Sequence, residues 1–186
     1  MMKRSILASI TGAVLVTLAA TGCSDESGKS EKASAAIDAC ALLTAADLDT
    51  AFDRTFNSDK AGQSAGGGAQ QGAMTTCDWV SPGAEVAGKP MASLNNTLFI
   101  NLIVWSWPAG SEGGAMYMKS MVDGAKTFNQ PVPEPVALGD AALWGDKTMH
   151  VQKGDVTMTL SLTGPGDETA KRTAAESLMK TALGRL

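Results

Sequence analysis

Apolar and polar residues alternate most regularly in the second half of the chain. Along Leu94–Trp107, apolar residues occupy both sets of alternate positions, and a strand with two apolar faces is typical of the interior of a sheet. Thr148–Lys153 and Val156–Thr163 also alternate, and the dipeptide Gly154-Asp155 between them suits a tight turn. The pattern therefore predicts a central strand followed, later in the chain, by a hairpin.

Three other stretches predict helices. Thr44 stands at the N-cap position ahead of apolar residues with helical spacing. Ser111–Lys126 has a helical pattern, although Gly113 and Gly114 each weaken a helix by about 1 kcal/mol. Asp167 is placed to cap a last amphipathic helix.

A further strand and a loop complete the predicted order. Thr75–Val80 predicts a strand with Cys77 and Trp79 on one face, and Ala61–Gly72, rich in Gly, Gln and Ser, predicts a mobile loop. The resulting order is helix, strand, strand, helix, strands, helix. It predicts an α+β domain in which helices cover an antiparallel sheet.

The N-terminus has the order of an export leader. Lys3 and Arg4 precede the uncharged stretch Ile6–Ala20, and small residues then lead to Cys23. This order resembles a bacterial lipoprotein signal, in which the cysteine is lipidated and becomes the new N-terminus. Ordinary secretion is the alternative, because Ala20 stands where such signals usually carry Leu. A permanent membrane span is disfavoured because the apolar stretch is shorter than the roughly 20 residues that a bilayer requires.

These features divide the chain into three parts. Residues 1–22 are predicted to be the signal peptide, residues 23–36 a flexible tether, and residues 37–186 a single α+β domain. The lipid on Cys23 would attach the protein to a membrane of the cell envelope. That membrane would be the outer membrane in a Gram-negative cell, or the extracytoplasmic face of the cell membrane in a Gram-positive one.

The charge of the chain restricts its partners. The full sequence has 15 basic and 19 acidic residues, a net charge of −4, and removal of the leader takes away Lys3 and Arg4. Nucleic acids and anionic lipid surfaces recruit clustered Lys and Arg, so this acidic balance argues against both.

The cysteines suggest one disulfide. If Cys23 is lipidated, Cys40 and Cys77 remain as a pair, and such pairs oxidise outside the cytosol. A metal site formed by these two cysteines and His150 would have too few ligands at any recognised spacing. A disulfide is therefore expected, and no metal or cofactor.

Four short motifs carry a family resemblance. They are CALLTAADL from Cys40, CDW from Cys77, LGDAALW from Leu138 and KGD from Lys153. In this order they resemble a family of cell-envelope lipoproteins with a domain of unknown function, best represented in actinobacteria. The resemblance implies a PsbP-like sandwich and a disulfide between the two motif cysteines, and it supplies no catalytic residues.

One motif suggests a serine hydrolase. The sequence GQSAG around Ser64 matches the G-x-S-x-G pattern, and chain order allows Asp140 or Asp146 and then His150 to follow. The motif needs a preceding strand and a following helix to hold the serine in a strained turn, and the flanking residues here are polar and Gly-rich. The loop interpretation is favoured.

A group of methionines suggests a copper site as a second alternative. Met116, Met118 and Met121 lie close together, and Met149 adjoins His150, the only histidine. Methionine is also a common filler of irregular cores, and Met116 lies off the helical face of the other two. Core packing is therefore the favoured interpretation.

The tryptophans are the remaining candidates for function. Trp105, Trp107 and Trp144 are proposed to line a ligand cleft. With no catalytic constellation in a suitable context, the sequence predicts a non-catalytic envelope lipoprotein that binds an envelope protein, a glycan or an apolar ligand.

Overall fold

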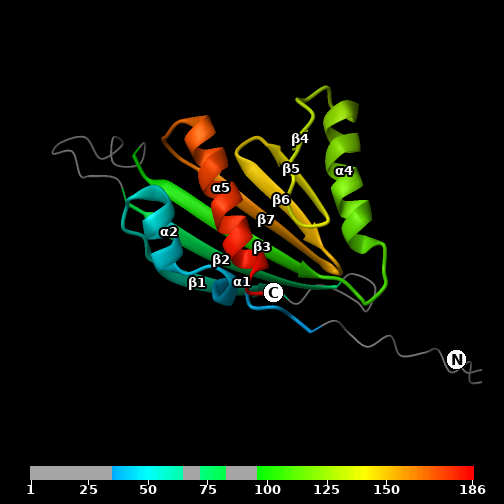
Figure 1. Cartoon of the computed structure of the whole chain (residues 1–186), viewed down its shortest axis with the longest axis horizontal. Coiled ribbons are helices and arrows are strands. Elements are labelled where there is room, and N and C mark those ends of the chain that lie inside the picture. Colours follow the sequence, from blue (N-terminus) through cyan, green and yellow to red (C-terminus); the bar gives the residue numbers. More distant parts are fainter. Residues whose placement is uncertain (1–34, 65–71, 83–95) are drawn as a thin grey trace, which may run out of the picture. The chain divides into compact units, whose positions relative to one another are not determined.

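The computed structural model describes residues 35–64, 72–82 and 96–186, with the side chains of residues 58–64 left aside. All of these described residues belong to one compact unit. Figure 1 shows a sheet with two short helices and one long helix on one face and a further long helix on the other.

The sheet is antiparallel throughout and has seven strands in the order β1-β2-β3-β7-β6-β5-β4. The strands are β1 (Asn57–Ser64), β2 (Ala73–Ser81), β3 (Leu98–Ser106), β4 (Glu134–Pro135), β5 (Ala141–Gly145), β6 (Thr148–Lys153) and β7 (Val156–Thr163). The predicted α+β class, with helices covering an antiparallel sheet, is confirmed.

The strands predicted from alternation are present. The apolar stretch predicted as a central strand forms β3, between β2 and β7, and it begins at Leu98 rather than Leu94. Residues 94 and 95 lie outside the described part of the chain. Strands β6 and β7 form the predicted hairpin, with Lys153 opposite Val156 across a two-residue turn.

Three strands, β1, β4 and β5, were not predicted. Strand β1 pairs with β2 and ends at Ser64, so the predicted loop over residues 61–72 is wrong for its first four residues. The alternation rule missed this strand because its sequence is polar. Strand β5 is joined to β6 by Asp146 and Lys147, which both have positive φ (46° and 59°), the geometry of a tight hairpin turn.

The helices are α1 (Ala39–Leu42), α2 (Ala45–Phe52), α4 (Gly113–Thr127) and α5 (Glu168–Leu183). Both predicted caps are confirmed. Thr44 and Asp47 form a reciprocal capping box, and the Asp167 side chain accepts a hydrogen bond from the Ala170 N–H.

The main core lies between the sheet and the layer of α1, α2 and α5. On the sheet side it includes Leu102, Leu160 and Met149, and on the helix side Leu178 and Met179, all nearly inaccessible to solvent. Helix α4 contributes no residue to this core, because it packs on the opposite face of the sheet.

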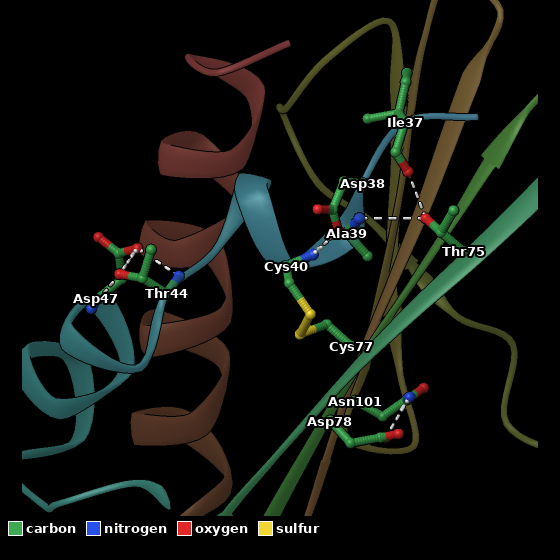
Figure 2. The surroundings of a disulfide bond; sticks show 10 residues. All are labelled: Ile37, Asp38, Ala39, Cys40, Thr44, Asp47, Thr75, Cys77, Asp78 and Asn101. Atoms are coloured by element: carbon green, nitrogen blue, oxygen red, sulfur yellow. Dashed lines mark hydrogen bonds between the residues drawn. A yellow bond between two sulfur atoms is a disulfide. The ribbon is translucent and has the colours of Figure 1, made fainter. Parts of the chain in front are cut away.

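A disulfide ties α1 to the sheet. Cys40 in α1 and Cys77 in β2 are bonded, with their Cα atoms 5.2 Å apart, which confirms the predicted pair (Figure 2). Beside it the Thr75 hydroxyl donates to the Ile37 carbonyl and accepts from the Ala39 N–H at 3.2 Å. The segment leading into α1 is therefore held to β2 by both covalent and hydrogen bonds.

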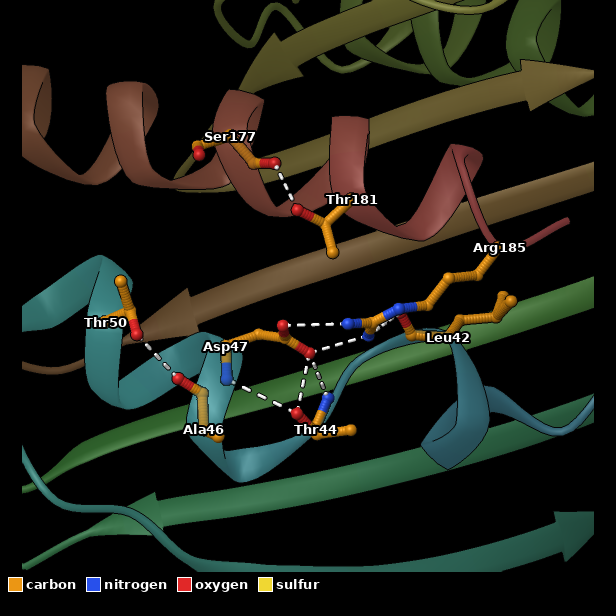
Figure 3. A network of polar contacts seen from close by, with 8 residues as sticks. All are labelled: Leu42, Thr44, Ala46, Asp47, Thr50, Ser177, Thr181 and Arg185. Carbon is orange, nitrogen blue, oxygen red and sulfur yellow. Dashed lines mark hydrogen bonds and ion pairs between the residues drawn. The ribbon is translucent and has the colours of Figure 1, made fainter.

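An ion pair joins the C-terminal segment to the start of α2. The Arg185 guanidinium donates to both carboxylate oxygens of Asp47, at 2.6 and 2.9 Å, and to the Leu42 carbonyl at 2.9 Å (Figure 3). The same carboxylate accepts from the Thr44 N–H at 2.8 Å. One carboxylate thus serves both as part of the helix cap and as the anchor of the C-terminus.

We expect replacement of both bridge cysteines, Cys40→Ala with Cys77→Ala, to lower the free energy of unfolding by about 2–4 kcal/mol. The bridge spans 37 positions, and releasing it restores chain entropy to the unfolded state. Urea unfolding of the purified chain measures the loss. Cys23→Ser, which leaves the bridge intact, is the control, and equal stability of the double variant and the control would contradict the expectation.

We expect Asp47→Asn to remove an acid-sensitive part of the stability. The Arg185 hydrogen bond lowers the pKa of Asp47 to about 2, so its contribution is complete above about pH 4 and is lost as the pH falls through 2. Arg185 is 37% exposed, and solvent screening reduces the expected contribution to about 1–2 kcal/mol.

Unfolding of both proteins between pH 7 and pH 2 measures this difference. The two curves should converge at low pH, and parallel curves would contradict the assignment. Asp53→Asn, a change at the exposed C-cap of the same helix, is the matched control, because asparagine also tolerates its positive φ.

Candidate functional site

Trp105 and Trp107 help to seat helix α4. Their rings stack at 5.5 Å with an interplanar angle of 15°, and the Trp107 indole N–H donates to the Thr157 hydroxyl at 2.9 Å. The Trp107 ring also meets Gly113, where a Cβ atom would lie only 2.4 Å from Cε3. Trp107 thus contacts both Trp105 and the first turn of α4, and both rings have a packing role.

Trp144 lies on the other face of the sheet. It is opposite Met149 in the β5–β6 pair, joins the main core and is 5% exposed. The structure therefore brings Trp105 and Trp107 together but separates both from Trp144, so the three do not share a cleft.

The edge of Trp144 lines a hollow of about 310 Å³, which we call the Trp144 hollow. It lies between the segment that forms β4, the β5–β6 turn and the first turns of α5. Its lining residues are Pro131, Val132, Glu134, Trp144, Gly145, Asp146, Glu168, Thr169 and Arg172. Of these residues, the sequence indicated only Trp144 as a ligand contact, because the others come from separate segments of the chain.

The lining of this hollow is predominantly acidic, with three carboxylates and one guanidinium. Arg172 is already paired, with Glu134 at 2.6 Å and with Glu176 at 3.3 Å, and the bond to Glu134 is the main reason that its pKa is raised. Among the described residues, Asp146 and Glu168 have no ion pair. The hollow is therefore suited to a positively charged group with some apolar surface.

The residues of the hydrolase hypothesis lie far apart. Ser64 is in β1 and His150 in β6, and the three strands between them place their backbones about 19 Å apart. The His150 ring contacts Tyr117 and lies 3.1 Å from the Thr159 hydroxyl, and burial lowers its pKa. Ser64 cannot use this histidine as a base.

The two aspartates of the same hypothesis lie in turns. Asp140 accepts from the Gly154 N–H at 2.7 Å and from the Lys153 ammonium at 2.8 Å. These bonds, the backbone one foremost, lower the pKa of Asp140. Asp146 occupies the β5–β6 turn described above.

The methionines of the copper hypothesis do not converge on His150. Met149 and His150 are neighbours in β6, so their side chains point to opposite faces of the sheet. Within α4, the side chain of Met118 is buried, whereas that of Met116 is 66% exposed. Within the described ranges no three His, Cys, Asp or Glu side chains are grouped as a metal site.

Cys23 and residues 65–71, which follow Ser64, lie outside the described part of the chain. Among the helices that the structure does describe, none combines the length and apolarity needed to cross a bilayer. Searches against family models, curated proteins and solved structures found no match to this chain.

We expect Gly113→Ala to lower the free energy of unfolding by about 1–3 kcal/mol, because the added methyl group would overlap the Trp107 ring. Urea unfolding measures the loss. Gly124→Ala, in the same helix with open space at the Cβ position, is the control and should be neutral or stabilising. Equal effects of the two changes would show that Trp107 does not hold α4 in place.

Proposed function

We propose that this protein is a non-catalytic, lipid-anchored binding module of the cell envelope, and that the Trp144 hollow receives a basic side chain of a partner protein. The observation that carries the binding proposal is the hollow itself, whose lining combines an aromatic side chain with two carboxylates that have no ion pair in the described part of the chain. Aromatic anchors with complementary charge are characteristic of protein interfaces.

The proposed location rests on the leader and the cysteines. The basic start, the apolar stretch Ile6–Ala20 and the small residues before Cys23 are those of a lipoprotein signal. The Cys40–Cys77 disulfide is in keeping with an oxidising compartment. The resemblance to cell-envelope lipoproteins points to the same place.

The non-catalytic part of the proposal rests on the separation of reactive groups. A nucleophile needs its general base within hydrogen-bond reach, and β1 and β6, which carry Ser64 and His150, are three strands apart. The chain has no second histidine that could replace His150.

A protein partner is favoured over the other ligands by the shape and charge of the hollow. The space is open, acidic and bordered by the exposed apolar side chain of Val132. A basic side chain with an aliphatic stem complements both features. A glycan would not use the charge, and an apolar ligand would leave the carboxylates without partners.

The anchor is tested by mass spectrometry of the mature protein from its native membrane. We expect an N-terminus at Cys23 that carries acyl chains. Cys23→Ser should move the protein from the detergent phase to the aqueous phase in detergent partitioning. An unmodified N-terminus at another residue would overturn the anchoring proposal without bearing on the hollow.

Binding at the Trp144 hollow is tested by titrating a short peptide of alternating arginine and glycine into the purified chain. Changes in the amide NMR shifts of the chain monitor the titration. We expect saturable shifts at Gly145 and Thr169. The double variant Asp146→Asn with Glu168→Gln should weaken binding by about threefold to tenfold, because two exposed charge interactions are lost. Asp123→Asn, a carboxylate on α4 away from the hollow, should have no effect.

The matched peptide of glutamate and glycine should not bind. Equal binding of both peptides, or an unchanged affinity in the double variant, would overturn the proposed basic partner. Shifts produced instead by an uncharged disaccharide would favour the glycan alternative.

A further inference from the structure

Lys171 in α5 is a buried cation without a carboxylate partner. Only 3% of its surface is exposed, and its ammonium donates to the Gly164 carbonyl in the turn that precedes α5. Over the described ranges no acidic side chain lies within ion-pair distance of it. Removing a charge from water is unfavourable unless an opposite charge compensates it, so this lysine would gain from an anion.

The lysine lines a second hollow, on the side of α5 away from the Trp144 hollow. We call this space, of about 220 Å³, the Lys171 pocket. Its walls are largely apolar and come from α2, from the start of β3 and from α5. The apolar wall residues are Ala51, Phe52, Leu98, Pro165 and Ala170.

Arg54 is a second cation at this pocket. Its guanidinium donates to the Asn96 carbonyl at 2.8 Å, and it has no ion pair with any residue in the described part of the chain. Lys147 lies near enough to lower the pKa of Lys171, after the larger effect of burial. Positive charge therefore accumulates beside an apolar space.

Among the described residues, the acidic side chains of the region form no ion pair with Lys171 or Arg54. Asp167 lines the pocket, but its carboxylate is used as the cap of α5, accepting from the Ala170 N–H at 2.9 Å. Glu168, three residues before Lys171 in α5, acts on it as an opposing charge without an ion pair, and it lines the Trp144 hollow. An anion entering the pocket would thus meet two cations that have no ion pair among the described residues, beside the one carboxylate of the helix cap.

We propose that the Lys171 pocket binds a small amphipathic carboxylate, whose apolar part packs against Phe52 and Leu98 and whose carboxylate lies between Lys171 and Arg54. The volume is below the roughly 300–1,000 Å³ of pockets that hold drug-sized ligands, so the ligand is small. This site is independent of the Trp144 hollow, because the two use different residues of α5.

The competing interpretation is that Lys171 only holds the turn at Gly164. The Lys171 side chain passes close to Gly166: its Cε would lie 3.4 Å from a Cβ atom added at that glycine. Its ammonium donates a hydrogen bond to the Gly164 carbonyl in the same turn. A purely structural lysine would leave the pocket without preference for anions. The experiment therefore compares ligands that differ only in charge.

The probes are hexanoate, hexanol and hexylammonium, titrated separately into the full chain carrying Cys23→Ser, so that no acyl group is present. Amide NMR shifts at Phe52, Leu98 and Ala170 report occupancy. We expect hexanoate to bind with a dissociation constant of about 1 mM, as befits so small a ligand. Hexanol should bind more weakly, and hexylammonium should not bind.

Lys171→Met keeps an unbranched apolar side chain and removes the charge. It should weaken hexanoate binding about tenfold or more, as expected for loss of a charged hydrogen bond, and leave hexanol binding unchanged. Arg54→Gln, at a half-exposed position, should weaken hexanoate binding less. Lys180→Met, which changes an exposed lysine of the same helix, is the control and should have no effect.

Absence of hexanoate shifts at the three reporter residues would overturn the proposal. Equal binding of hexanoate and hexylammonium, or an unchanged affinity in Lys171→Met, would also overturn it and leave the turn-holding role. If Lys171→Met does not fold, Arg54→Gln decides, and an unchanged hexanoate affinity in that variant rejects the site.

Discussion

The attachment of α1 to β2 is the constraint on which the layer of helices depends. A helix of four residues has too few internal hydrogen bonds to persist alone. The Cys40–Cys77 bond and the contacts of Thr75 hold it against the sheet. Helix α2 follows α1 almost directly, so the same attachment also positions the capping box at Thr44.

The C-terminal segment completes this layer through charge. The Asp47 carboxylate caps α2 and accepts both arms of the Arg185 guanidinium, and Arg185 also bonds the end of α1 at Leu42. Two segments separated by most of the domain are thereby joined at one point. Helix α5, which ends just before this point, is held over the core and forms a wall of both hollows.

Helix α5 separates two sites of opposite charge. Glu168 and Arg172 face the acidic Trp144 hollow, whereas Ala170 and Lys171 face the cationic pocket. This division follows from helical geometry: successive residues are about 100° apart around a helix, so positions 168 and 172 lie on one side of α5 and positions 170 and 171 on the other. A basic partner and a small carboxylate could therefore occupy the two sides of one helix without competing.

The sequence by itself determined the elements whose signals are local. Alternation identified β3, the β6–β7 hairpin and β2, and the side chains of Thr44 and Asp167 marked helix starts, because periodicity and capping depend on neighbours within a few residues. The disulfide was predictable as well, since the lipoprotein-like leader assigns Cys23 to another role and leaves only one pair. The polar strand β1 was missed because its place depends on pairing with β2.

Only the tertiary structure decided what the candidate site residues do. Gly113 looked like a weak point of its helix, but it is what allows α4 to approach the Trp107 ring. Trp144 was separated from the other two candidate tryptophans because successive side chains along a strand project from opposite faces of the sheet, and Trp144 lies on the face of the main core. Both hollows combine residues from distant segments, and neither the charge of their linings nor the burial of Lys171 can be derived from spacing along the chain.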